Sequence, residues 1–296
     1  MTDRVLEFAE KGAYLSLKGA LLAIQPQDQE EVTLPLKEVA VVVASHPQVT
    51  FSHPVLAALA QAGVMVVVSG PNHLPAAMLL PVEGHFTQSE RFARQAALPL
   101  PVKKQLWRHI AKAKVAAQGR LLHLLHGADQ GLGAMAARIK SGDADNVEAQ
   151  AARRYWGALF ADPDFHRERT REDQNRFLNY GYTVLRAAVA RAVCAAGLHP
   201  SLGLHHHNRY DAFCLADDLM EPLRPVVDAA VVRVVNTHGP QAPMDKTIKE
   251  TLLTALLDRF DWDGEQRTLF DISARMAQSL AAVVDGKKKR MILPEI

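Results

Sequence analysis

The chain has 296 residues with a formal net charge of +2, and 48% of them are hydrophobic and 22% charged. This composition excludes a disordered or fibrous protein and leaves room for one large domain or two unequal ones. No apolar run approaches the length of a membrane span, and no signal-peptide pattern follows the first residues, so we expect a cytoplasmic protein without membrane contact.

The first part of the chain is predicted to be rich in β-strands. Short apolar stretches between polar or glycine-containing breaks predict strands within residues 5–8, 14–24, 32–36, 39–44 and 64–69. A helix is predicted from about 54 to 62, because Ser52 is a good N-cap, Pro54 suits a first helical turn and Gly63 can end it. Residues 69–72 predict a turn.

The character of the sequence changes after Pro81, and alanine, leucine and arginine dominate from about Phe86 onward. Helical periodicity replaces strand-like runs there. We therefore predict an α+β protein with a small β-rich domain over residues 1–83 and a larger all-α domain over residues 84–296. Cys194 and Cys214 lack the spacing of a redox or zinc site and are expected in the core.

A long helix is predicted over residues 102–126. Its inward stripe is expected to consist of Leu106, Ile110, Ala113, Ala117, Leu121 and Leu124. On the opposite face, Lys104, Arg108 and Lys112 lie four residues apart and could follow a phosphate backbone. Eight Lys or Arg and no Asp or Glu occur from residue 91 to 120, and residues 287–290 form a second basic run. Such clusters often mark nucleic-acid contact, although a solvated helix face is an equally good interpretation.

Glu148 is predicted near the start of a helix that Asp145 or Asn146 can cap. Its helical spacing places it on the same face as Tyr155 and Leu159. A carboxylate on an apolar face is costly unless it is paired or binds a metal ion. The alternative is a wet first-turn carboxylate that only favours the helix dipole.

Residues 173–182 predict an amphipathic helix that carries tyrosines and amides. Asn175 and Asn179, four residues apart, could brace a neighbouring helix through hydrogen bonds. Structural packing is the favoured interpretation for this segment.

Residues 203–225 hold the densest group of candidate ligands. Asp218 and Glu221 lie three apart on a predicted helix, so they share a face and repel each other unless a cation lies between them. Hard oxygen ligands favour Mg²⁺ or Mn²⁺, and one imidazole shifts the preference toward Mn²⁺ without excluding Mg²⁺. Consecutive histidines cannot converge on one ion in regular structure, so at most one or two of residues 205–207 belong to such a site.

Three blocks of this sequence together resemble the CRISPR-associated adaptation endonuclease, the first-numbered Cas protein family. They are Glu148 with the Ala-Arg-Arg-Tyr-Trp of 152–156, the Leu-Asn-Tyr-Gly-Tyr of 178–182, and residues 197–200 through the Asp-Leu-Met-Glu-Pro-Leu-Arg-Pro of 218–225. The resemblance covers essentially the whole chain and implies a catalytic helical domain. It also implies a metal site of Glu148, His206 and Glu221, with Asp218 as a fourth contributor. His206 is chosen over His205 by its spacing from Glu221.

The resemblance implies a metal-dependent transesterification with Mg²⁺ or Mn²⁺. In that reaction the 3′ end of a double-stranded DNA fragment is joined to a CRISPR array. It further implies a homodimer bridged by a small second adaptation subunit. The stretch with Asn208, Tyr210 and Phe213 resembles the variant found in type II systems. Two alternatives remain at this point: a general metal-dependent nuclease acting on branched or single-stranded DNA, and a non-catalytic DNA-binding scaffold.

Overall fold

The protein is described from a computed structural model that covers residues 4–70, 75–79, 87–162 and 164–296. The chain divides into two compact units, Met1–Gln88 and Ser89–Ile296. The first is β-rich and the second is mostly helical, so the predicted α+β class is confirmed. The predicted boundary near residue 84 lies outside the described residues, as does part of the turn predicted at 69–72. Within the described ranges, no helix is long and apolar enough to cross a lipid bilayer.

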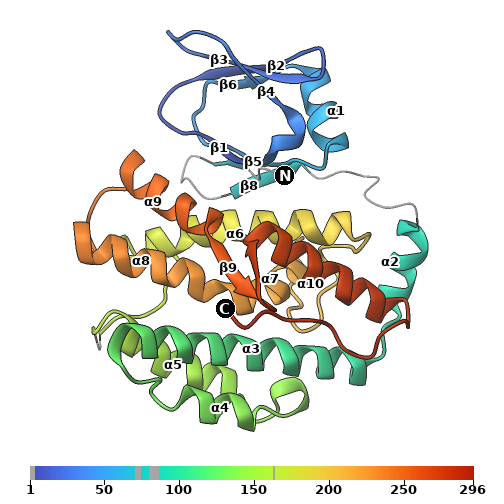
Figure 1. Ribbon diagram of the computed structural model, residues 1–296, viewed down its shortest axis with the longest axis vertical. Coiled ribbons are helices and arrows are strands. Elements are labelled where there is room, and N and C mark those ends of the chain that lie inside the picture. Colours follow the sequence, from blue (N-terminus) through green and yellow to red (C-terminus); the bar gives the residue numbers. More distant parts are fainter. Residues whose placement is uncertain (1–3, 71–74, 80–86, 163) are drawn as a thin grey trace. The chain divides into compact units, whose positions relative to one another are not determined.

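The first unit contains two four-stranded sheets and a helix (Figure 1). One sheet has the order β1-β5-β7-β8 and the other β4-β3-β2-β6. Its elements are β1 (Arg4–Phe8), β2 (Ala13–Lys18), β3 (Leu21–Pro26), β4 (Val32–Pro35), η1 (Leu36–Glu38), β5 (Val39–Ala44), β6 (Val49–Phe51), α1 (His53–Gln61), β7 (Met65–Ser69) and β8 (Pro75–Leu79).

The core of the first unit forms where apolar runs are longest. Every residue of β5 is buried, and β5 pairs in parallel with both β1 and β7. A strand that is flanked on both sides in a parallel arrangement is expected to read as a continuous apolar run. The predicted run at 14–24 is the antiparallel hairpin of β2 and β3, which turns at Gly19 with a φ of +62°. Ser52 caps α1 as predicted, accepting a hydrogen bond from the N–H of Val55.

The second unit is a helical assembly built around α6. Its elements are α2 (Gln88–Ala96), α3 (Leu100–His126), α4 (Leu132–Arg138), η2 (Ser141–Asp143), α5 (Val147–Leu159), α6 (Asn175–Ala195), α7 (Cys214–Met220), η3 (Glu221–Leu223), α8 (Arg224–His238), α9 (Lys246–Leu257), β9 (Arg259–Trp262), β10 (Glu265–Thr268) and α10 (Leu269–Val284). Helix α6 packs against α7, α8, α9 and α10, which explains why most of its residues are buried. Both α4 and α5 lie along the long helix α3 (Figure 1).

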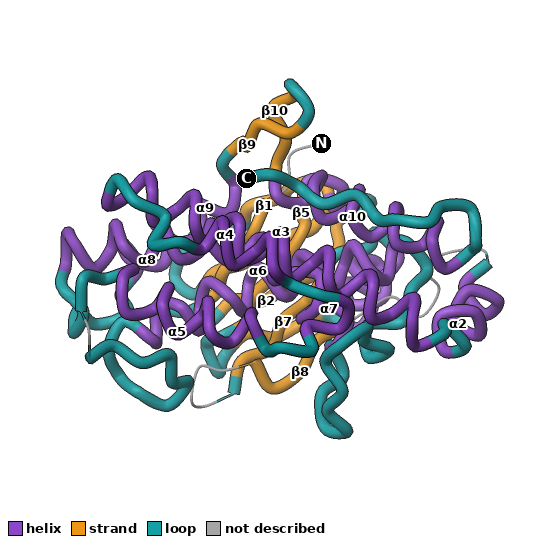
Figure 2. The backbone as a smooth tube through the Cα atoms, turned by 90° about the horizontal axis from the view of Figure 1, so that it is seen from below, coloured by secondary structure: helices purple, strands orange, loops and turns teal. Residues whose placement is uncertain are grey.

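One strand pair interrupts this helical unit. Strands β9 and β10 form an antiparallel hairpin that projects from the helices (Figure 2). Asp263 and Gly264 make its turn with φ angles of +56° and +76°. Asp-Gly is the sequence typical of such two-residue turns. The prediction of an all-α second domain is therefore corrected at this hairpin.

The long helix α3 begins and ends close to its predicted limits. Leu106, Ile110 and Ala117 are buried as expected, but Leu124, in the last turn of the helix, is 81% exposed. Gly127 ends the helix with a left-handed φ of +75°. Away from α3, Cys194 and Cys214 are buried, as predicted.

Candidate active site

Lys114 contacts two carboxylates that come from elements far apart in the sequence. Its Nζ lies 2.5 Å from Oε1 of Glu148, on α5, and 2.6 Å from Oε2 of Glu221, at the start of η3. Lys114 and Glu221 are buried, whereas Glu148 keeps 22% of its side chain exposed. Two of the acidic residues singled out by the sequence therefore meet at one shared ammonium group.

Glu148 is positioned by the N-terminus of α5, which Asp143 holds. The Asp143 carboxylate accepts hydrogen bonds from the backbone N–H groups of Val147 and Glu148, both at 2.9 Å. Asn146 occupies the N-cap position but has a left-handed backbone, with a φ of +51°, and makes no capping side-chain bond. The prediction of Asp145 or Asn146 as the cap was wrong, because a capping side chain normally requires an extended backbone.

Glu221 is held between two basic groups. Its Oε1 lies 3.1 Å from Nη2 of Arg224, and its Oε2 faces Lys114. Burial alone would raise the pKa of Glu221, but the charges of Arg224 and Lys114 outweigh burial and lower that pKa. Burial likewise opposes the charge on Lys114, yet Glu221 and Glu148 raise its pKa. Glu221 and Lys114 are therefore charged near neutral pH, and the formal charges of Glu148, Glu221, Lys114 and Arg224 sum to zero.

Asp218 organises the histidine segment from a fully buried position on α7. Its Oδ2 accepts the backbone N–H groups of Leu204, at 2.5 Å, and His205, at 3.1 Å. Its Oδ1 accepts the N–H of His206 at 3.2 Å and lies 2.7 Å from Nδ1 of the same residue. These four contacts saturate the carboxylate, because its two oxygens offer about four acceptor sites.

The three histidines have different environments. The Nδ1 of His206 is engaged by Asp218, which leaves Nε2 as the ring nitrogen available to a ligand. The hydrogen bond to Asp218 raises the pKa of His206. His205 instead stacks on buried Trp107, with ring centroids 4.1 Å apart and planes 4° apart. His207 is exposed.

The approach of the histidine segment to α7 depends on Gly203. A Cβ at that position would lie 2.3 Å from the backbone oxygen of His206 and 3.1 Å from Oδ2 of Asp218. Real Cβ contacts of 2.3 Å do not occur, so no larger residue fits without moving the segment. The path of this segment thus depends on Gly203, a position that the sequence pattern did not single out.

The donor groups suit a hard divalent cation. Two carboxylates that already share one cationic partner, with an imidazole fixed through its Nδ1 nearby, are the ligand types expected for Mg²⁺ or Mn²⁺. Throughout the described ranges, however, no three His, Cys, Asp or Glu side chains are already arranged around one metal position. The ammonium group of Lys114 instead lies between Glu148 and Glu221.

The tyrosine block of residues 178–182 packs against helix α8 and its first residue, Arg224. Tyr155 and Tyr182 both donate hydrogen bonds to buried Asp228, the first at 2.7 Å. The guanidinium carbon of Arg224 lies 4.8 Å from the centre of the Tyr182 ring. Gly181 lets α6 approach α8, because a Cβ there would lie 2.5 Å from Cγ1 of Val227. This confirms that packing is the role of the tyrosine block, and it connects that block to Arg224 and so to Glu221.

Asn175 and Asn179 brace a loop rather than a helix. Arg167 donates from Nη1 to Asn175 at 2.9 Å and from Nη2 to Asn179 at 2.7 Å. Asn175 also donates to the backbone oxygen of His166. The two amides therefore fasten the loop before α6 onto that helix.

The predicted basic row lies against the α4–η2 segment. Arg108 Nε donates to the backbone oxygen of Ile139 at 3.1 Å, and Lys112 Nζ donates to that of Ala137 at 3.2 Å. Lys104 is exposed and its aliphatic carbons lie beside Gly142. The row therefore also fastens the chain that leads to α5.

The basic run from 91 to 120 is not a continuous surface. Arg91 is buried and pairs with Asp285 at 2.8 Å, while Lys114 is part of the acidic cluster. A narrower positive region remains around His109. Its pKa is lowered by burial first and then by the charges of Arg290, Arg108 and Lys112. One residue of the C-terminal basic run thus lies near two members of the predicted row.

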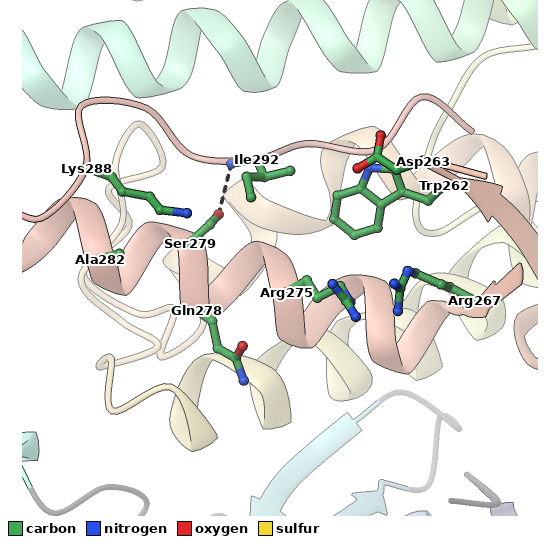
Figure 3. Close-up of a pocket in the computed structure, with 9 residues that line it drawn as sticks. All are labelled: Trp262, Asp263, Arg267, Arg275, Gln278, Ser279, Ala282, Lys288 and Ile292. Atoms are coloured by element: carbon green, nitrogen blue, oxygen red, sulfur yellow. Dashed lines mark hydrogen bonds between the residues drawn. The ribbon is translucent and has the colours of Figure 1, made fainter. Parts of the chain in front are cut away.

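A cavity of about 220 Å³ in the second unit is lined by none of the candidate metal ligands (Figure 3). It is lined by Trp262, Asp263, Arg267, Arg275, Gln278, Ser279, Ala282, Lys288 and Ile292. Its arginines are paired within the protein, because Asp271 lies 2.5 Å from Arg267 and 3.1 Å from Arg275, and Glu265 also contacts Arg267. The Ser279 hydroxyl accepts the N–H of Ile292 at 2.9 Å, which fixes the C-terminal segment there.

Comparison with known proteins decides the family. The family model described as CRISPR associated protein Cas1 matches residues 6–255. The chain belongs to the Cas1 family. All of it aligns, at 35% identity, with 97% of the CRISPR-associated endonuclease Cas1 of Neisseria meningitidis serogroup C (strain 8013).

Two solved structures share the Cas1 fold of this chain. A casposase bound to integration product matches with a TM-score of 0.80 and 19% identity, over 97% of this chain and 92% of that one. A chain of a Cas6-RT-Cas1–Cas2 complex matches with a TM-score of 0.74 and 16% identity, over 97% of this chain and 35% of that one. The resemblance stated from the sequence blocks is thus confirmed at the level of the Cas1 family.

Proposed function

We propose that this Cas1-family protein is the DNA integrase of a CRISPR adaptation system, acting in the cytoplasm to join short DNA fragments into a CRISPR array. One observation carries the proposal: Glu148 and Glu221, from distant segments, converge on a single cation beside a histidine that Asp218 orients. The likeness to a casposase bound to integration product supports strand joining over hydrolysis alone.

The reaction proposed is a transesterification. The 3′-hydroxyl oxygen of the fragment forms a bond to a phosphorus of the array, and the bond from that phosphorus to the array's own 3′ oxygen breaks. The proton of the attacking hydroxyl is lost and the departing oxygen gains one, so the number of phosphodiester bonds is unchanged. The work left to the protein is positioning and charge stabilisation.

Glu148, His206 and Glu221 would hold Mg²⁺ or Mn²⁺. When bound, such an ion polarises a phosphodiester and favours the alkoxide form of a hydroxyl. Glu148 is half-buried and so can face a DNA strand, whereas Glu221 is buried and fixed by Arg224. His206 contributes Nε2 in this assignment.

Asp218 is proposed as a positioning residue and not as the fourth ligand. Its oxygens already accept three backbone N–H groups and face Nδ1 of His206. A carboxylate in this relation to a ligating histidine fixes the ring and its tautomer.

DNA is proposed to bind the positive region around His109. Arg108, Lys112 and Arg290 gather there, and exposed Lys104 extends the row along α3. Such contacts bind phosphates without reading sequence.

The assembly proposed is a homodimer bridged by a small second adaptation subunit. Similarity to the Cas1 part of a Cas6-RT-Cas1–Cas2 complex supports it. A twofold arrangement would let two active sites act on the two ends of one double-stranded fragment. The type II-like variant remains a proposal that rests on residues 208–213 and on the similarity to the Neisseria meningitidis relative.

A strand-joining assay tests the function. Wild-type protein, the second subunit, a duplex fragment with 3′-hydroxyl ends and a plasmid array are mixed with Mn²⁺. We expect Glu148→Ala and Glu221→Ala to abolish joining, and Asp218→Asn to lower it by about 10–100-fold. Glu250→Ala, which removes an exposed carboxylate of α9, is the matched control and should join normally.

Two outcomes of this assay would favour an alternative function over the integrase. A fragment with blocked 3′ ends should give no product with an integrase, so cleavage that persists without any joining would indicate a general nuclease. Full joining by both glutamate variants would indicate a non-catalytic scaffold.

A further inference from the structure

Lys114 occupies the position at which Glu148 and Glu221 meet. Its Nζ is 2.5 Å and 2.6 Å from their oxygens, and divalent ions bind carboxylate oxygens at about 2.0–2.6 Å. An ammonium group and a dication cannot both take these oxygens as close partners, because the two cations would then repel each other at close range in a buried site.

The charge balance of the cluster points to the same competition. Glu148 and Glu221 are balanced by Lys114 and Arg224, so the cluster is formally neutral as it stands. A dication added beside Lys114 would leave two excess positive charges in a buried place. A dication that replaces Lys114 would leave one, and the single negative charge of a phosphodiester would remove it.

The displaced ammonium group then needs a new anionic partner. Lys114 is 9% exposed at its side chain, and an unpaired buried charge is strongly unfavourable. A second DNA phosphate, next to the one that balances the metal, would supply that partner.

We propose that Lys114 is an internal cation that the catalytic metal must displace, and that a DNA phosphate receives the displaced ammonium group, so that metal and DNA bind cooperatively. This rests on the metal site of the proposed function. Lys114 would thereby determine when the site binds its metal ion.

Mn²⁺ binding, measured by electron paramagnetic resonance and calorimetry, tests the proposal without turnover. The probes are Mn²⁺ alone and Mn²⁺ with a short duplex that ends in 3′-dideoxy nucleotides. For wild-type protein we expect the duplex to lower the Kd for Mn²⁺ about tenfold, within the usual range of coupling between two sites. Lys114→Met should bind Mn²⁺ about tenfold more tightly than wild type without DNA and gain little from the duplex.

Lys103→Met is the matched control. It removes the same charge about three turns earlier on α3 and should leave Mn²⁺ affinity without DNA unchanged. Lys114→Gln is the second variant, because it keeps a hydrogen-bond donor if the methionine variant is unstable. The rise in Tm on adding Mn²⁺ gives a second readout, and it should be larger in both Lys114 variants than in wild type.

The outcomes separate this inference from the proposed function. If Lys114→Met and Lys114→Gln bind Mn²⁺ no more tightly than wild type, and their Tm rises no further, Lys114 does not compete with the metal. If Glu221→Gln binds Mn²⁺ as well as wild type does, the metal site itself is wrong.

Discussion

Asp228 is a buried carboxyl group at the centre of the helical unit. Burial raises its pKa to about 6, against the hydrogen bonds from Tyr182 and Tyr155, which lower it. In the unfolded chain the same group has its ordinary pKa of 3.8. Between these values the native state holds a proton that the unfolded state has lost. The free energy of unfolding therefore falls as the pH rises through this window.

Asp228→Asn should remove that slope. Relative to the variant, the wild type should lose on the order of 2–3 kcal/mol of unfolding free energy between pH 4 and pH 7, since one pKa unit corresponds to about 1.4 kcal/mol. Urea unfolding at a series of pH values measures the difference. A constant difference across this range would show that Asp228 titrates normally.

The candidate site shows which residues a sequence can reveal. Glu148 and Glu221 stood out because carboxylates on apolar faces are conspicuous, and their role as metal ligands was implied by the resemblance to the family. Lys114 was missed, although a signal exists: it follows Ile110 by four residues and precedes Ala117 by three, so it stands in the buried stripe of α3. The exact partners of Asp218 could not be predicted, because they depend on how a segment without regular structure folds back onto α7.

At the scale of elements, helices α6 and α8 cross at close range because position 181 has no side chain. A Cβ at position 181 would lie 2.5 Å from Cγ1 of Val227, which is closer than carbon atoms approach without strain. The crossing therefore requires glycine on α6. Since α8 begins with Arg224, the spacing of these helices also bears on the partner of Glu221.

Gly181→Ala is expected to lower the free energy of unfolding by about 1–3 kcal/mol, the usual cost of overpacking. Val227→Ala in the same chain should restore part of it, because it removes the methyl group that clashes. Urea unfolding of the two single variants and the double variant measures the coupling. Additive effects of the two substitutions would mean that a clash with Val227 is not the cause of the destabilisation by Gly181→Ala.

Elements with strong local signals were predictable, and those set by context were not. The apolar run of β5 and the caps of α1 indicated their structures directly. The β9–β10 hairpin carried an Asp-Gly turn signal, but its strands have only four residues each, so helical composition around them dominated the prediction. Leu124 fits the helical spacing yet is exposed, because periodicity alone does not tell which positions of a helix other elements cover.

At the scale of the whole molecule, the second unit holds every group of the candidate site. Its α2 and α10 are joined by the buried pair of Arg91 and Asp285, and Arg91 Nη1 also donates to the backbone oxygen of Ala196 at 2.6 Å. These contacts lie within residues 89–296. The unit therefore contains its own core and closing contacts.

Residues 89–296, expressed alone, should fold and bind Mn²⁺ with the affinity of the full chain. Circular dichroism and a cooperative thermal transition check the fold, and calorimetry checks the affinity. A folded fragment with much weaker binding would show that the first unit takes part in the site.

Because Trp107 stacks on His205, tryptophan fluorescence can report on the histidine segment. Indole emission responds to an imidazole in face-to-face contact, and the other two tryptophans, Trp156 and Trp262, can be replaced by phenylalanine. The remaining fluorophore, Trp107, then reports in real time and without a label whether the histidine segment stays in contact with α3 when cations and nucleic acid bind.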